Sequence, residues 1–493
     1  MYLGIDCGTQ GTKAVVLDSE SGRVLGRGAA GHRLLSGANG RREQDPAEWV
    51  QTLVSASRQA LADAGVAGQA IVGVGVSGQQ HGLVLLDARG QVLRPAKLWC
   101  DTETTVENAR LLADLGGTQG SLERLGLALA PGYTLSKLLW SKERFPELFD
   151  QIAHVLLPHD YLNFWLTGRY CSEYGDASGT GYFNVRTRGW DLELLDVVDP
   201  GGRLRRALPT LVSADEAVGR VRPDAAAELG ISPDALVSSG GGDNMMAAIG
   251  TGNISPGLFT MSLGSSGTVY GYTDSPVVCP EPSVATFCSS TGGWLPLICT
   301  MNLTNVTSQV RDLLRLDLGA FNEAVAGAPI GAEGVLMLPF LNGERVPALP
   351  EATGSILGLT TANMNAANLC RAAVEGTTFG LRYGLDLLRA AGMQSSAIRL
   401  VGGGAKSPVW RQLVADVMNT PVICTVEPEA AALGAALQAA WCAQGGNGTL
   451  AGLEALCARC VMLDETTQCL PKPENVAAYQ PIYARYRTLL SHL

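Results

Sequence analysis

Charged residues are scarce in this sequence, and no segment concentrates positive charge. Asp, Glu, Lys and Arg make up only 17% of the 493 residues, and the formal net charge is −10. Nucleic acids and anionic membranes bind through clustered Lys and Arg, so neither is an expected partner. No apolar run approaches the roughly 18 residues that a membrane span needs. We therefore expect a cytoplasmic protein.

Several familiar motifs are also missing. No Gly-Lys pair occurs, which excludes a P-loop, and no histidine begins the pattern H-E-x-x-H. Residues 73–78 match G-x-G-x-x-G, but a strand pattern follows where a dinucleotide site requires a helix. The 12 cysteines are scattered through apolar contexts, which indicates reduced thiols. Cys457 and Cys460 form a C-x-x-C without the second pair or histidine of a zinc site.

Two segments of the sequence share one plan. Apolar residues make up 46% of a chain long enough for two large domains. Residues 2–18 read as an apolar strand, a Gly- and Thr-rich turn and a second apolar strand. Residues 258–273 repeat this pattern, with Gly264–Thr268 in place of Gly8–Thr12. The sequence therefore indicates one architectural unit used twice.

Strand and helix patterns alternate along both halves, which predicts a mixed α/β fold. The sequence GGGDN interrupts them within Ser239–Met246, where glycine favours a hinge but also fits a simple turn. We place the domain boundary there, with domains at 1–244 and 245–493. The other predicted elements are helices at Trp49–Ala64, Ala366–Ala391 and Pro408–Asn419, the last capped by Ser407, and strands within Ile71–Asp87, Leu338–Leu341 and Ile398–Val401.

Two aspartates stand where structural roles explain them incompletely. Asp6 ends the first strand, and strand interiors disfavour Asp. It is a candidate ligand of Mg²⁺, directly or through water, and a turn-capping role is the alternative. Asp243 follows three glycines and precedes an apolar helix, so it is either a helix N-cap or a residue beside a ligand. In a kinase site, Asp243 could accept the proton of an attacking hydroxyl.

Three glycine clusters, each after an apolar strand, predict nucleotide binding through backbone N–H groups. The third precedes the Ser407-capped helix. The candidate phosphate contacts are Gly8, Thr9, Thr12, Gly264, Ser265, Ser266, Gly267, Gly403, Gly404 and Ala405.

A polar cluster between two apolar runs is the candidate sugar site. Gln80 and His81 could hydrogen-bond sugar hydroxyls, although a lone histidine is more often structural. Trp99 could supply an aromatic wall and Asp101 a hydroxyl acceptor. A packed tryptophan and a turn aspartate are equally good interpretations of these two residues.

Ordered sequence blocks resemble the FGGY carbohydrate kinases from residue 1 to nearly the end of the chain. The blocks are YLGIDCGTQGTK, EQDPAEW, SGQQHG, LLPHDYLNFWLTG, SEYGDASGT, GGGDN, SLGSSGT, LPFLNGERVP and GGGAKSPVWRQLVADV. The resemblance implies a duplicated actin-like, ribonuclease H-like fold with a cleft between two domains. It implies that ATP lies against the second domain and the sugar against the first.

The resemblance also implies roles for residues. Asp243 matches the family's catalytic base, Asp6 the acidic residue near Mg²⁺, and Gln80 with His81 the pair that contacts the sugar. Asp101 and Asn244 fall at further sugar contacts, and Gly264–Gly267 with Gly403-Gly404 match the nucleotide loops. Two departures occur: the family's Trp-Asn-Asp block reads Trp-Cys-Asp-Thr-Glu at residues 99–103, and Ser265 replaces the usual Thr.

The expected activity is transfer of the γ-phosphoryl group of ATP, with Mg²⁺, to the 5-hydroxyl of D-xylulose. Related kinases of ribulose, gluconate, fuculose or glycerol share most of these features, and only the Gln79–Gly82 segment favours xylulose. An actin- or Hsp70-like ATP-dependent binding protein would need a separate client-binding region, for which no spare domain is visible. The sequence leaves the oligomeric state open, including a homodimer.

Overall fold

The first half of the chain is built on a mixed sheet in which strand β6 lies between β1 and β16. The computed structural model describes residues 1–277, 279–445 and 449–492. Strands β1 and β2 form the predicted antiparallel hairpin, and β1 pairs in parallel with β6, so that Asp6 lies beside Ser77. Strand β6 also pairs with β16, which sets Gly241 beside Ser77. The strands are β14 (Ala217–Arg220), β15 (Leu236–Ser238), β16 (Gly241–Gly242), β6 (Gly73–Gly78), β1 (Tyr2–Cys7), β2 (Gly11–Asp18) and β3 (Arg23–Gly31).

The second half contains a sheet with the same core arrangement. Strand β17 forms an antiparallel hairpin with β18 and pairs in parallel with β23, just as β1 does with β2 and β6. The predicted duplication is therefore confirmed. In sheet order the strands are β19 (Ala285–Cys288), β20 (Trp294–Thr300), β18 (Gly267–Gly271), β17 (Leu258–Leu263), β23 (Ala397–Val401), β24 (Val422–Thr425) and β25 (Leu463–Cys469).

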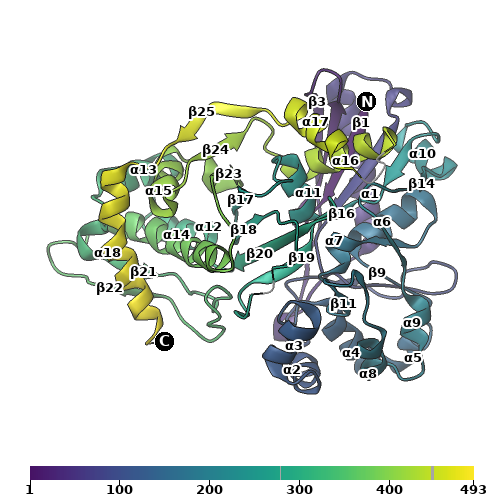
Figure 1. Cartoon of the computed structure of the whole chain (residues 1–493), viewed down its shortest axis with the longest axis horizontal. Helices are drawn as coiled ribbons and strands as arrows, with labels where there is room; N and C mark the ends of the chain where they lie inside the picture. Colours follow the sequence, from purple (N-terminus) through teal and green to yellow (C-terminus); the bar gives the residue numbers. More distant parts are fainter. Residues whose placement is uncertain (278, 446–448, 493) are drawn as a thin grey trace.

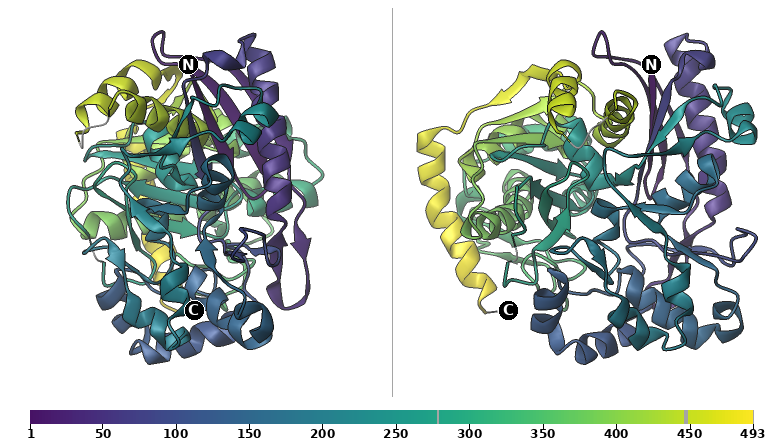
Figure 2. Two further views of the ribbon diagram at one scale, coloured as in Figure 1. Left: turned by 90° about the vertical axis from the view of Figure 1, so that its right-hand side faces the viewer. Right: turned by 45° about the vertical axis from the view of Figure 1, so that its right-hand side comes forward.

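Helices surround both sheets, and the two halves lie side by side (Figure 1). Helix α18 and strand β25 run along the outer side of the second half (Figures 1 and 2). A group of short helices forms the lower part of the first half in Figure 1. The main helices are α1 (Pro46–Ala64), α2 (Thr105–Asp114), α3 (Gly117–Leu125), α4 (Thr134–Arg144), α6 (Pro158–Thr167), α11 (Asp243–Gly250), α12 (Thr304–Leu313), α14 (Ala366–Ala390), α15 (Pro408–Met418), α16 (Ala430–Ala443), α17 (Ala451–Cys460) and α18 (Pro473–Leu490).

Helix α16 comes from the late part of the chain but packs against the first sheet (Figure 1). Glycines make this approach possible. A Cβ atom at Gly4 would lie 1.9 Å from the carbonyl oxygen of Ala432, and one at Gly75 would lie 2.0 Å from that of Ala435. Such distances are far below van der Waals contact, so side chains at these positions would force the helix away from the sheet. The alanine-rich helix thereby ties the two halves together through backbone contact.

Most predicted elements are confirmed, with differences at their ends. Helix α1 begins at Pro46 instead of Trp49, because Pro46 is in the first turn and the Asp45 side chain accepts a hydrogen bond from Ala47 N. Helix α15 is capped by Ser407, as predicted. The strand expected at 338–341 is instead β21 (Leu336–Leu338), which ends before Pro339, a residue without an N–H for pairing.

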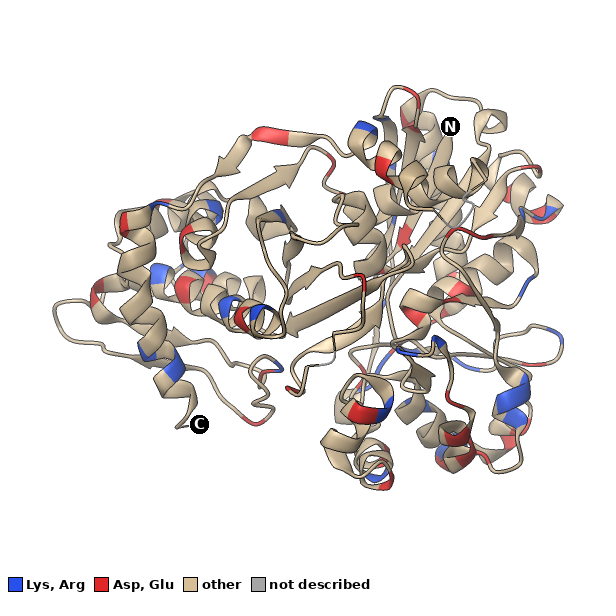
Figure 3. Cartoon of the chain, in the orientation of Figure 1, with Lys and Arg blue, Asp and Glu red and all other residues tan. Residues whose placement is uncertain are grey.

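The cysteines are present as thiols, as predicted. Cys457 and Cys460 are buried in α17, with their Sγ atoms directed at the carbonyl oxygens of Ile249 and Ser19. Basic residues are spread over both halves alongside acidic ones (Figure 3). Among the residues that the structure describes, no helix is both long and apolar enough to cross a membrane.

Candidate active site

Asp6 lies at the carboxyl end of β1, where the sheet meets its glycine-rich turn. Its Oδ1 accepts a hydrogen bond from Ser77 Oγ at 2.7 Å, the neighbour that the β1–β6 register provides. Burial raises the pKa of Asp6 to about 6, and the charge of Glu429 adds to this, while Ser77 and Lys13 act in the opposite direction. The contacts are with Ser77 and not with turn N–H groups, so they do not support the turn-capping alternative.

Asp243 is the first residue of α11 and follows Gly241 by two positions. Gly241 and Asp6 both lie beside Ser77 of β6. Gly242 is the N-cap, and the Asp243 carboxylate bonds its neighbour instead: Oδ1 accepts from Asn244 N at 2.8 Å and from Asn244 Nδ2 at 2.9 Å. The N-cap alternative for Asp243 is therefore wrong. Burial raises the pKa of Asp243 to about 7, and the charge of Asp6 is the next cause.

Strand pairing brings these distant carboxylates into one region: Asp6 and Gly241 both lie beside Ser77, and Asp243 follows Gly241 by two residues. The charge of Asp6 accordingly contributes to the raised pKa of Asp243. Carboxylate and hydroxyl oxygens are the ligands that Mg²⁺ prefers. A divalent cation at Asp6 would offset the cost of keeping two half-buried carboxylates charged. The donor set therefore fits magnesium, with Asp6 as the residue that would hold it.

Gln80 and His81 lie in the turn between β6 and β7 (Val84–Leu86). Gln80 is buried, and its Oε1 accepts a hydrogen bond from Asn244 Nδ2 at 3.0 Å. The sequence-predicted sugar pair is thus connected to Asp243 through Asn244. The contact also shows that β6 and α11 converge at the same point, as the β6–β16 pairing requires.

His81 is held in one orientation and in one charge state. Its backbone has φ of +63°, its ring packs edge-on against Tyr133 at 4.6 Å, and its Nδ1 lies 2.8 Å from the carbonyl oxygen of Gly179. Burial and the charge of Lys137 lower the pKa of His81 to about 3, so the ring is neutral. Because a carbonyl only accepts hydrogen bonds, Nδ1 carries the proton and Nε2 is left as an acceptor. An acceptor nitrogen suits a sugar hydroxyl.

Trp99 connects the candidate sugar wall to the first glycine-rich turn. Its Nε1 donates to Thr9 Oγ1 at 2.9 Å, and Thr9 Oγ1 donates to Gln79 Oε1 at 3.2 Å. Thr12 is placed differently, because its buried hydroxyl bonds His32 at 2.9 Å and Thr52 at 3.0 Å. Of the two threonines, Thr9 is the better placed for a phosphate contact.

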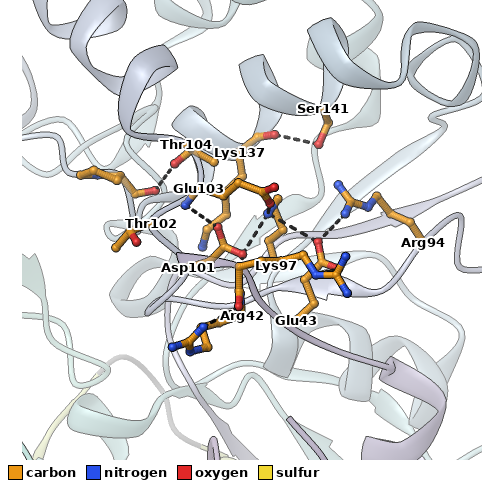
Figure 4. A network of polar contacts seen from close by, with 12 residues as sticks. Arg42, Glu43, Arg94, Lys97, Asp101, Thr102, Glu103, Thr104, Lys137 and Ser141 are labelled. Carbon is orange, nitrogen blue, oxygen red and sulfur yellow. Dashed lines mark hydrogen bonds and ion pairs between the residues drawn. The ribbon is translucent and has the colours of Figure 1, made fainter. Parts of the chain in front are cut away.

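Asp101 is fully buried in an ion-pair network around Lys97 (Figure 4). Its Oδ2 accepts from Lys97 Nζ at 2.9 Å and from Arg42 N at 2.8 Å, and its Oδ1 accepts from Glu103 N at 3.1 Å. Glu103, part of the unusual block at 99–103, also accepts from Lys97 Nζ at 2.6 Å. A sugar contact by Asp101 stays a prediction, and it would have to share oxygens that protein donors already occupy.

The second and third glycine clusters pack against each other. The second, Gly264–Gly267, is the β17–β18 turn, and the third follows β23, the parallel neighbour of β17. Gly402 has φ of +88°, and a Cβ there would lie 2.8 Å from the carbonyl of Leu263, so only glycine fits. Gly403 is exposed with open space around it, and Gly404 and Ala405 lie buried behind it. A ligand could therefore approach the backbone at Gly403.

Sequence reasoning did not assign roles to a buried polar pair beside Asp243. His159 and Asp176 are both fully buried, with 2.5 Å between Nδ1 and Oδ2, and the charge of Asp176 contributes to the raised pKa of Asp243. Glu173 lies in the same region and accepts hydrogen bonds from Gly175 N and Ser290 Oγ. In the sequence, these residues could have been noticed as charged or titratable residues within segments of otherwise apolar or small residues.

Comparison with known proteins places the chain in a family. The model of the N-terminal domain of the FGGY family of carbohydrate kinases matches residues 1–250, and that of the C-terminal domain matches residues 260–443. The chain belongs to the FGGY family of carbohydrate kinases, and it is a phosphotransferase. The predicted duplicated actin-like, ribonuclease H-like α/β fold is confirmed. The exact boundary between 244 and 245 stays a prediction.

The curated relatives and solved structures are similar over most or all of the chain. The chain is 51% identical to the xylulose kinase of Haemophilus influenzae, covering 100% of both, and 41% identical to that of Streptomyces rubiginosus, covering 89% of this chain and 87% of that one. A xyloylose kinase from Brucella ovis has a TM-score of 0.90 at 32% identity, covering 99% and 98%. A gluconate kinase from Lactobacillus acidophilus has the same TM-score at 26% identity, covering 100% and 98%. The fold alone therefore does not select the sugar.

Proposed function

We propose that the protein transfers the γ-phosphoryl group of MgATP to the 5-hydroxyl of D-xylulose, giving D-xylulose 5-phosphate. The observation that carries this proposal is the strand pairing that sets Asp6 and Asp243 in one region beside Gln80, His81 and Asn244. Full-length similarity to xylulose kinases favours this sugar over gluconate. The bound cation would neutralise phosphate charge, and Asp6 would hold it.

Asp243 is the proposed general base. With a pKa near 7 it is a stronger base than an ordinary aspartate, and it is about half ionised at pH 7 and largely ionised at mildly alkaline pH. The hydroxyl oxygen of the ketose forms a bond to the γ-phosphorus, the bond from that phosphorus to the bridging oxygen breaks, and ADP leaves. The hydroxyl proton passes to Asp243. Asn244 holds the carboxylate in place through two hydrogen bonds to Oδ1.

The nucleotide is proposed to lie against the second half. The turn at Gly264–Gly267, in which Ser265 is exposed, and the exposed Gly403 before α15 provide backbone that phosphate oxygens could approach. Thr9 and Gly8 approach from the first half. Movement of the two halves toward each other would exclude water from the γ-phosphate.

The experiment is a coupled ADP-release assay with MgATP across D-xylulose, D-ribulose, gluconate, fuculose and glycerol. We expect the highest kcat/KM with D-xylulose and a single phosphorus resonance of a 5-phosphate monoester in the product. Asp243→Ala should reduce sugar-dependent turnover by at least about a thousandfold, since it removes the base and its alignment of the hydroxyl. Near wild-type turnover by this variant, or preference for another sugar, would refute the corresponding part of the proposal.

A further inference from the structure

Arg345 belongs to the second half of the chain but extends to the sugar side of the first. Its Cζ lies 5.6 Å from the centroid of the Trp99 ring, within the range of a cation–π contact. Trp99 in turn bonds Thr9 in the first glycine-rich turn. Arg345 is therefore a direct contact between the two halves beside the site. The sequence block LPFLNGERVP contains it, and no part of the proposed mechanism uses it.

The backbone of Arg345 is fixed to the second sheet by its neighbour Glu344. This carboxylate is buried, and its Oε1 accepts from Met301 N and Arg345 N, each at 2.7 Å. Its Oε2 accepts from Asn302 Nδ2 at 2.9 Å, and the same amide nitrogen donates to the carbonyl oxygen of Gly343 at 2.7 Å. Met301 and Asn302 directly follow β20. These hydrogen bonds hold the backbone of Arg345 in one position, and its side chain reaches Trp99 of the first half.

The guanidinium lacks a carboxylate partner among the residues that the structure describes, since no Asp or Glu oxygen lies within 4.0 Å of it. It is half-buried. A guanidinium has five N–H donors, and a half-buried one without an ion pair keeps donors for a ligand. Burial and the charge of Lys137 lower the pKa of His81, and the charge of Arg345 adds to this; burial raises the pKa of Tyr133, and the charge of Arg345 opposes that rise. Its neighbours are therefore the walls of the sugar site.

We propose that Arg345 is a ketose-binding residue supplied by the nucleotide-side half, which donates hydrogen bonds to hydroxyl or carbonyl oxygens of the acceptor sugar. Because its backbone moves with the second sheet, the sugar site is complete only when the two halves are together. The contacts with Trp99 and the effects on His81 and Tyr133 place it with the sugar and not with the glycine clusters at Gly264 or Gly403. This inference rests on the proposed ketose kinase function.

The test separates sugar binding from phosphate binding. Arg345→Gln should raise the KM for D-xylulose about 10- to 100-fold, the effect of losing hydrogen bonds from a charged donor. The KM for ATP, and the slow ATP hydrolysis without sugar, should change less than about twofold. Arg345→Lys, which keeps the charge but loses the planar fork, should have an intermediate KM for the sugar. Arg311→Gln is the matched control, because Arg311 lies in the same half and, within the described part of the chain, its ion pair is with exposed Asp312.

Three results for Arg345→Gln would overturn the inference. The first is an unchanged KM for the sugar, and the second is an equal rise in the KM for the sugar and for ATP. The third is a loss of sugar-independent hydrolysis as large as the effect on the sugar, which would assign Arg345 to the phosphates. Thermal unfolding of each variant checks its fold, and if Arg345→Gln is unfolded the comparison is made with Arg345→Lys. If the wild-type protein instead prefers another sugar, the proposed function fails. Arg345 is then judged by the KM for that preferred sugar.

Discussion

Replacing Asp243 by Asn is expected to stabilise the ligand-free protein while removing its sugar-dependent activity. The pKa of Asp243 is about 7 in the folded state and 3.8 as the ordinary value. A folded-state pKa that is raised means that the folded protein binds this proton more tightly than the unfolded chain does. The free energy of unfolding is therefore highest below pH 4 for this group and falls as the pH rises from about 4 to about 7.

The size of the effect follows from the width of that pH window. Each pH unit corresponds to about 1.4 kcal/mol for one proton, so three units give an upper limit of about 4 kcal/mol. Asp243 is only half-buried, so screening by water reduces this limit, and we expect on the order of 2 to 4 kcal/mol at pH 8. Asn has nearly the same shape and never becomes charged. The advantage of Asp243→Asn should therefore be largest at pH 8 and shrink toward pH 5.

The assay is urea unfolding of the wild-type and variant proteins at several pH values, with chelator and without ligands. Asp6→Asn provides the second arm, because the charge of Asp6 contributes to the raised pKa of Asp243. In the Asp6→Asn background, the stabilisation by Asp243→Asn should be smaller than in the wild type. If Asp243→Asn is no more stable at pH 8, or if its effect is independent of both pH and Asp6, the reasoning about the paired carboxylates is wrong.

Three further predictions concern rate and packing. The kcat/KM for the ketose should rise with pH through about 7 as Asp243 loses its proton, and a flat pH–rate profile from pH 6 to 8 would contradict its role as base. Gly4→Ala places a methyl group 1.9 Å from the carbonyl oxygen of Ala432, so it should lower the free energy of unfolding by at least about 2 kcal/mol, measured by urea unfolding. A free energy of unfolding within about 0.5 kcal/mol of the wild-type value would show that α16 can shift freely. Ser407→Ala removes the cap of α15 and should lower the free energy of unfolding by about 1 kcal/mol in the same measurement, with the KM for the sugar unchanged. A larger effect on that KM than on stability would contradict a capping role.

The parts of the fold that sequence reasoning predicted are those with local causes. The hairpins at 2–18 and 258–273 follow from alternating apolar residues on both sides of a glycine-rich turn, and the cap of α15 follows from Ser407 and Pro408. The expected strand at 338–341 was displaced because Pro339 has no N–H to donate to a neighbouring strand.

Other features depend on packing between segments far apart in the sequence. Helix α16 reaches the first sheet because Gly4 and Gly75 leave room for its backbone, and no local pattern pairs these glycines with residues 432 and 435. The candidate site also combines residues that a local sequence pattern indicates with residues that only long-range packing brings together. Asp6, Gln80 and Asp243 were found because polar residues interrupt apolar strands, whereas the network around Asp101 and the position of Arg345 depend on side chains that meet only in the folded protein.

The most direct test of the account is a crystal structure of the protein with D-xylulose, Mg²⁺ and a non-hydrolysable ATP analogue. The account predicts the 5-hydroxyl of the ketose within about 3 Å of an Asp243 carboxylate oxygen and on the line of the γ-phosphate, with the cation on the Asp6 side. A ketose whose 5-hydroxyl lies away from Asp243, with another group positioned to take its proton, would contradict it.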